Sequence, residues 1–116
     1  MRVMVMGKAT KDTEAEVPPD PQMIEAMDKY NQALIAAGIL KDGGGLKPTR
    51  FAKRVHFSGK NRTVIDGPFA ETKDVIAGYM IWEVKSIEEA IEWVKKGPVL
   101  SGSDVEIRPL YSPDDF

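Results

Sequence analysis

The sequence predicts an α+β protein with a ferredoxin-like protomer, in which an antiparallel sheet carries two helices on one face. The chain has 116 residues, enough for one domain of ordinary size. Two amphipathic helices alternate with short strand-like runs in the order β-α-β-β-turn-β-α-β. Setting aside the extra strand of a hairpin leaves the split βαβ arrangement. A single domain is expected to span residues 1–116.

The N-terminal segment predicts a strand followed by a loop. Arg2–Gly7 alternates valine against methionine, which makes it apolar on both faces. This pattern is typical of a sheet covered on both sides. Lys8–Asp20 is polar, carries two prolines near its end, and is expected to form a long loop.

Both helices carry recognisable start and stop signals. Asp20 is a good N-cap for a helix over Pro21–Ala37, which begins with proline at its first position. Gly38 follows where a left-handed C-cap residue is expected. The second helix starts at the capping-box sequence Ser86–Glu89 and ends at Gly97-Pro98.

The remaining runs predict a loop, a hairpin and two more strands. Asp42–Gly45 is rich in glycine and is expected to be a flexible loop that could act as a lid. Phe51–Ser58 and Thr63–Ile65 are expected to pair as a hairpin. Ile76–Val84 and Val105–Leu110 show the alternation of the last two strands.

Apolar residues on both faces of the sheet predict a homodimer. If two helices cover one face, the other still carries large apolar side chains from Tyr79–Val84. An exposed apolar patch of this kind usually marks an interface. Two sheets packed face to face across a two-fold axis would cover it. The alternative is that the loop Lys8–Asp20 folds over the sheet.

Composition limits the partners and the chemistry. The net charge is −2 and the chain has no lysine- and arginine-rich run, so a nucleic-acid partner is not expected. No apolar stretch reaches the roughly 18 residues needed to span a bilayer, so a membrane role is not expected either. There is no cysteine, and His56 is the single histidine, which excludes a multi-histidine metal site within one protomer. We expect a cytoplasmic protein without metal or bound cofactor.

One motif has a specific resemblance. Residues 66–73 read DGPFAETK, in which Asp-Gly and Gly-Pro are both turn dipeptides. Together with Gly45–Pro48, Phe57–Lys60 and Val105–Leu110, in that order along the chain, this motif resembles the DGPF branch of the YCII-related domain family. The resemblance implies a dimeric α/β barrel of ferredoxin-like protomers, with a cleft between sheet and loops.

The same resemblance weakens an enzymatic interpretation. In YCII-like relatives, a histidine on the first helix and an aspartate before a proline after the second helix were proposed as a catalytic pair. Here Pro21–Ala37 contains no histidine, and Gly97 precedes Pro98. The proposed pair therefore cannot be carried over. Members of the DGPF branch are also similar to proteins encoded near sigma factors, which implies a regulatory protein partner as one possibility.

Four candidate site residues come from the motif itself. Asp66 could be a general base or a ligand anchor, or it could cap its own turn. Glu71 and Lys73 could supply a carboxylate and a cation to a ligand, with the hydroxyl of Thr72 beside them. The structural alternative is a solvated surface pair that contributes little stability.

Two further candidates lie outside the motif. His56 alternates with Val55 and Phe57, so it would face solvent or a cleft if those two point into the core. It could transfer protons, and Asp66 is the first partner to examine, although a surface role is the usual one. Tyr30 could line an apolar pocket with the other large aromatic residues, or simply pack in the core.

Three functions remain open on the sequence. The first is a small-molecule binding or sensing protein with a cleft near Asp66, His56 and the first loop. The second is a cofactor-free enzyme that uses acid–base chemistry at Asp66 and His56. The third is an interaction module that docks a regulatory protein.

Overall fold

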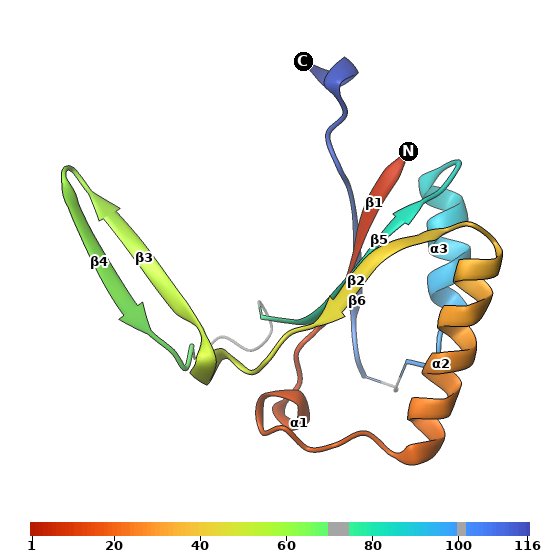
Figure 1. The fold of residues 1–116 in the computed structure, drawn as a ribbon, viewed down its shortest axis with the longest axis horizontal. Helices are drawn as coiled ribbons and strands as arrows, with labels where there is room; N and C mark the ends of the chain where they lie inside the picture. Colours follow the sequence, from red (N-terminus) through yellow and green to blue (C-terminus); the bar gives the residue numbers. More distant parts are fainter. Residues whose placement is uncertain (70–74, 100–101) are drawn as a thin grey trace.

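The computed structural model describes residues 1–69, 75–99 and 102–116 (Figure 1). Its sheet strands are β1 (Arg2–Lys8), β2 (Leu40–Gly45), β5 (Ile76–Glu83) and β6 (Val105–Pro109). The helices are α1 (Lys11–Glu14), α2 (Pro21–Ala36) and α3 (Ile87–Lys95). Strands β3 (Lys53–Ser58) and β4 (Asn61–Asp66) form a separate hairpin. Short 3₁₀ turns lie at Thr49–Phe51 and Pro113–Asp115.

The four-stranded sheet has the order β2-β5-β1-β6, and every pair of neighbours is antiparallel. Helices α2 and α3 lie on the same side of it (Figure 1). This strand order with two helices on one face is the ferredoxin-like arrangement. The predicted α+β fold class is therefore confirmed. None of the described helices has the length and hydropathy needed to cross a membrane.

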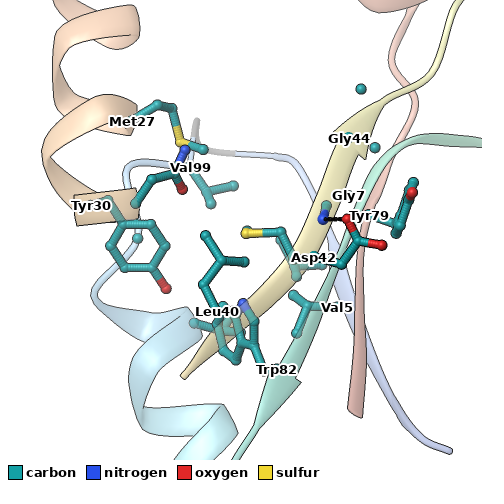
Figure 2. Close-up of a pocket in the computed structure, with 18 of the residues that line it drawn as sticks. Val5, Gly7, Met27, Tyr30, Leu40, Asp42, Gly44, Tyr79, Trp82 and Val99 are labelled. Carbon is teal, nitrogen blue, oxygen red and sulfur yellow. Dashed lines mark hydrogen bonds between the residues drawn. The ribbon is translucent and has the colours of Figure 1, made fainter. Parts of the chain in front are cut away.

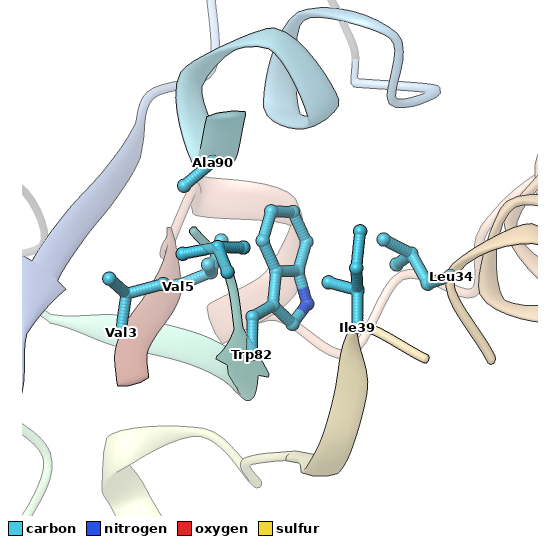
Figure 3. Close-up of a cluster of buried hydrophobic side chains, with 7 residues drawn as sticks. Val3, Val5, Leu34, Ile39, Trp82 and Ala90 are labelled. Atoms are coloured by element: carbon cyan, nitrogen blue, oxygen red, sulfur yellow. The ribbon is translucent and has the colours of Figure 1, made fainter. Parts of the chain in front are cut away.

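The core lies between the sheet and the two helices. Val3 pairs with Trp82 and Val5 with Met80 across β1 and β5, so these side chains share the face that meets the helices. The indole of Trp82 is fully buried at the centre of the cluster (Figure 3). Leu34 from α2 and Ala90 from α3 close the cluster from the helix side.

The predicted helix ends are confirmed by their caps. The Asp20 carboxylate accepts a hydrogen bond of 2.7 Å from the backbone N–H of Gln22. The Ser86 hydroxyl accepts one of 3.2 Å from the N–H of Glu89. Gly38 has φ +74°, the left-handed conformation predicted for the residue after α2.

The prediction of a loop at Asp42–Gly45 is wrong, because this segment belongs to the edge strand β2. Glycine is a poor strand former, and the sequence gives no other reason to expect pairing here. The structure supplies the reason at Gly43. A Cβ on this residue would lie 3.0 Å from both Met80 Cγ and the Tyr79 carbonyl oxygen of β5. The strand therefore approaches β5 closely, and the segment is not a lid.

The hairpin is also placed differently from the prediction. Both of its strands lie outside the main sheet and project away from it, and β2 takes the place expected for a hairpin strand (Figure 1). Every residue of β3 and β4 is exposed. Val55 and Phe57 therefore do not point into the core as the alternation suggested. We call this hairpin, residues 53–66, the arm.

The loop predicted over Lys8–Asp20 contains the single-turn helix α1. Thr10 and Thr13 cap it reciprocally, since the backbone N–H of each donates to the hydroxyl of the other. The local side-chain hydrogen bonds thus stabilise one helical turn in a segment that was expected to be an open loop. None of the sheet strands packs extensively against α1.

Candidate functional site

A cavity of about 680 Å³ opens between the helices and the sheet (Figure 2). Its lateral walls come from α2, the edge strand β2 and the segment after α3. The lining is mainly apolar and includes Val5, Met27, Leu40, Met80, Trp82 and Val99. This volume lies in the range of small-molecule sites, about 300–1000 Å³.

Tyr30 projects from α2 into this region (Figure 2). Its hydroxyl donates a hydrogen bond of 2.5 Å to the carbonyl oxygen of Trp93 in α3. Burial raises the pKa of Tyr30 from 10.0 to about 12, because desolvation disfavours the phenolate. The side chain is therefore neutral at physiological pH, and its oxygen can still accept a hydrogen bond. Tyr30 is thus among the residues that line the cavity, and its role in ligand binding stays a prediction.

Two other polar atoms of the cavity lining are buried and lack partners. Asn31 Oδ1 and Trp82 Nε1 find no hydrogen-bond partner among the residues that the structure describes. A buried polar group without a partner costs about 1–3 kcal/mol. One of these atoms is an acceptor and the other a donor.

The cavity interior carries no ionised side chain among the described residues that line it. Lys41 and Asp42 border it, but both are exposed. Asp42 pairs with Ile81 across the strands, on the sheet face opposite to that of Leu40 and Trp82 (Figure 2). Its carboxylate accepts a hydrogen bond of 2.8 Å from the N–H of Gly43. The wall that faces the helices is therefore neutral.

The DGPF turn lies outside the cavity lining, at the base of the arm. Asp66 accepts a hydrogen bond of 2.7 Å from Lys53 Nζ, and both side chains are largely exposed. A Cβ on Gly67 would lie 1.7 Å from the carbonyl oxygen of Thr49. The N–H of Phe69 donates to the hydroxyl of Thr49 over 3.1 Å. The described part of the motif thus fastens the arm to the turn at Thr49.

Thr49 is the centre of this junction and is the buried polar residue there, 7% exposed. Its hydroxyl donates a hydrogen bond of 2.5 Å to the Glu14 carboxylate, which also accepts from the Thr49 backbone N–H. Nearby, Arg50 forms an ion pair with Glu16. Glu14 and Glu16 of the first loop are therefore engaged by the turn. The described chain holds no group of three or more potential metal ligands.

His56 does not meet Asp66 within the arm. His56 pairs with Thr63, and Asp66 pairs with Lys53, three positions away along β3. Since successive side chains of a strand point to opposite faces, the two side chains lie on opposite faces of the hairpin. The pairing of His56 with Asp66 that the sequence suggested is therefore not formed in one chain.

The predicted residues thus fall into separate groups. Tyr30 lies in the cavity lining, and Asp66 and His56 lie on the arm. Glu71, Thr72 and Lys73 lie outside the described residues, so their binding role stays a prediction. Sequence reasoning missed Asn31, whose position next to Tyr30 on the helix was the available signal.

Fold and cavity together define an α+β protein of ferredoxin-like topology with an apolar chamber between its sheet and helices. The model of the YCII-related domain family matches residues 1–112, and the chain belongs to this family.

Two known proteins are similar to this chain. An uncharacterised protein of Rhizobium meliloti (strain 1021) is 29% identical over 101 residues, which cover 84% of this chain and 82% of the relative. Among solved structures, the 5-chloro-2-hydroxyhydroquinone dehydrochlorinase of Burkholderia phenoliruptrix AC1100, in complex with 2,5-dihydroxybenzoquinone, covers 98% of both chains. Its sequence identity is 17% and its TM-score is 0.49.

Proposed function

We infer that the protein binds or senses a small, uncharged, largely apolar molecule in the cavity between α2 and the sheet. The observation that carries this proposal is the pair of buried polar atoms, Asn31 Oδ1 and Trp82 Nε1, that have no partner among the described residues and belong to a mainly apolar lining. Specific sites combine apolar walls with a few convergent polar groups.

The polar atoms define what the ligand must offer. The indole N–H of Trp82 can donate to a carbonyl or hydroxyl oxygen of the ligand. Asn31 Oδ1 can accept from a hydroxyl or amide N–H. The lone pairs of the Tyr30 oxygen add a second acceptor, because its proton is already used on Trp93. A cyclic or aromatic molecule with one donor and one acceptor meets these requirements.

The neutrality of the interior selects against ions. Transfer of a charged group from water into an apolar site is costly unless an opposite charge or a set of hydrogen bonds compensates it. The interior offers neutral partners, and Lys41 and Asp42 stay at the exposed border. Binding is favoured over proton transfer at this site because Tyr30, with a pKa of about 12, holds its proton near neutral pH.

The proposed site is at Tyr30, and the arm residues Asp66 and His56 are not part of it. The test is a thermal-shift screen of uncharged aromatic and alicyclic compounds on wild type, Asn31→Leu and Asp66→Asn. The cavity is supported as the binding site by a compound that binds wild type and Asp66→Asn with equal apparent affinity. The same compound should bind Asn31→Leu at least tenfold more weakly. A compound that loses its effect in Asp66→Asn and keeps it in Asn31→Leu would move the site to the arm.

A further inference from the structure

The cavity wall that the sheet provides contains a row of residues without side chains. Gly45 of β2 pairs with Gly78 of β5, and Gly78 pairs with Gly7 of β1. All three glycines line the cavity. Gly7 follows Val3 and Val5 at alternate positions of β1, so the row lies on the sheet face that meets the helices. We call Gly7, Gly45 and Gly78 the glycine row.

Neither backbone conformation nor packing within the chain requires glycine at Gly7 and Gly45. The described glycines with a positive φ lie elsewhere, at Gly38, Gly59 and Gly102. A Cβ on Gly7 or on Gly45 would meet no atom within 4 Å. Glycine weakens a strand, because it loses more conformational freedom on folding than any other residue. A glycine inside a strand often marks a place where a ligand approaches the backbone closely.

A buried donor on the same face of the sheet points independently to a ligand. Trp82 is fully buried, and its Nε1 finds no hydrogen-bond partner among the described residues. Its side chain lines the same cavity as the glycine row (Figure 2). Trp82 and Gly78 are four positions apart on β5, so their backbones lie about 13 Å apart along the strand. A ligand on the row can therefore direct a polar group along β5 toward the indole N–H.

The glycine row has the dimensions of a flat ring system. Neighbouring strands are about 4.8 Å apart, so the three backbones span about 10 Å. Without a Cβ, the peptide groups face the cavity directly, and a flat ring can lie on them at about 3.5–4.0 Å. Aromatic side chains cover glycines in sheets in a comparable way. The row ends at Val105 of β6, whose branched side chain limits how far a ring can extend.

The remaining walls of the cavity also suit a ring. Met27 of α2 and Val99 line the cavity away from the sheet (Figure 2). Met80 lies between Gly78 and Trp82 on the same face of β5. Methionine adapts its shape to what it packs against, and its sulfur makes favourable contacts with aromatic rings. Flexible thioethers thus border a floor of bare backbone.

We propose that a flat aromatic ligand lies on the glycine row, and that Gly7 and Gly45 select flat rings over saturated rings of the same skeleton. This inference rests on the proposed function and adds the shape of the ligand to it. A flat ring contacts the row with its whole face, whereas a saturated ring touches it only through its axial C–H groups. A methyl group at Gly7 or Gly45 would lift the flat ring off the backbone.

The test compares flat compounds with their saturated counterparts. The probes are 2-naphthol and quinolin-2-one, each paired with its fully hydrogenated form, so that skeleton and polar group are matched. All four molecules are uncharged at pH 7 and offer one donor and one acceptor. Isothermal titration calorimetry gives their affinities.

The protein variants place methyl groups on one face of the sheet or on the other. The row variant is Gly7→Ala with Gly45→Ala. Gly78 is left unchanged, because a Cβ there would lie 3.3 Å from the carbonyl oxygen of Gly44. The control is Gly44→Ala, since Gly44 pairs with Tyr79 and its Cβ would contact the Tyr79 ring at 3.6 Å on the opposite face. Circular dichroism confirms that each variant is folded.

We expect wild type and Gly44→Ala to bind at least one flat compound with equal affinity, and at least tenfold more tightly than its saturated counterpart. The row variant should bind that compound at least tenfold more weakly. The comparison of flat and saturated compounds on wild type does not depend on how any variant folds. If no flat compound binds wild type more tightly than its counterpart, the proposal is overturned. Unchanged affinity of the row variant would also overturn it.

The variant Asn31→Leu separates this proposal from the proposed function. A saturated compound that binds wild type as tightly as the flat one, and loses affinity in Asn31→Leu, leaves the cavity as the site and refutes the selection by the glycine row. A flat compound whose affinity is unchanged in both Asn31→Leu and the row variant binds elsewhere, and both proposals then fail.

Discussion

The hydroxyl of Tyr30 donates a hydrogen bond of 2.5 Å to the carbonyl oxygen of Trp93, and so joins the two helices across the cavity. The two residues are 63 positions apart in sequence. The bond fixes the spacing of α2 and α3 on the side where the cavity opens. Removing it should therefore change both the stability and the site.

We predict that Tyr30→Phe lowers the free energy of unfolding by about 1 kcal/mol, because the Trp93 carbonyl loses its donor. Urea denaturation followed by tryptophan fluorescence measures this loss. An unchanged midpoint and slope would show that the bond is not important for stability.

The raised pKa of Tyr30 also predicts that the stabilities of wild type and Tyr30→Phe depend differently on pH in the alkaline range. The pKa of Tyr30 is about 12 in the folded chain and about 10 in the unfolded chain. Between these values the folded protein keeps a proton that the unfolded chain has lost, so the free energy of unfolding falls as the pH rises. The stabilising contribution of Tyr30 is complete below about pH 10 and is lost as the pH approaches 12. Tyr30→Phe should lack this component, and parallel pH profiles for the two proteins would contradict the assignment.

The junction at Thr49 should be more important for stability than the exposed pair at Asp66. Thr49→Val keeps the shape of the side chain but removes the donor to Glu14 and the acceptor for the N–H of Phe69. We expect a loss of about 1–3 kcal/mol. Asp66→Asn removes only an exposed ion pair with Lys53, which contributes about 0–1 kcal/mol. Chemical denaturation of both variants ranks them, and the reverse order would contradict the structural role assigned to the turn.

Gly67→Ala should be among the most damaging single changes. Its Cβ would lie 1.7 Å from the Thr49 carbonyl oxygen, so the backbone at the base of the arm must shift. Gly45→Ala is the matched control, since nothing lies within 4 Å of its Cβ. We expect a loss of several kcal/mol or failure to fold for Gly67→Ala, and a change within about 1 kcal/mol for Gly45→Ala. Equal melting temperatures for the two would refute the close packing.

The sequence predicted the parts of the fold that local chemistry determines. The caps at Asp20, Ser86 and Gly38 and the periodicity of α2 and α3 depend on neighbours in the chain, so the helices could be placed. Strand β2 could not be predicted from Leu40–Gly45, because Gly43 is explained only by the close approach of β5. The contact with β5 makes this segment a strand, although glycine has a low strand propensity.

The candidate site could be predicted only in part, because some of its features are local and others depend on tertiary contacts. Tyr30 has the helix position and the size of a pocket residue, and the sequence left a pocket role and a packing role open for it. Asp66 and His56 were attractive as titratable groups, but only the strand register shows that they lie on opposite faces. The role of Trp82 as a donor depends on its burial without a partner, a property that no sequence pattern indicates.

The most direct test of the proposed function is the indole N–H resonance of Trp82 in a ¹⁵N-correlated NMR spectrum. The chain has two tryptophans, and a Trp93→Phe variant assigns the two indole signals. Wild type and Asn31→Leu are titrated with the uncharged compound that gives the largest thermal shift. Binding in the cavity predicts a saturable downfield shift of the Trp82 indole proton in wild type, and at least tenfold weaker binding in Asn31→Leu. If the compound binds while the Trp82 signal stays in place, the cavity is not the site.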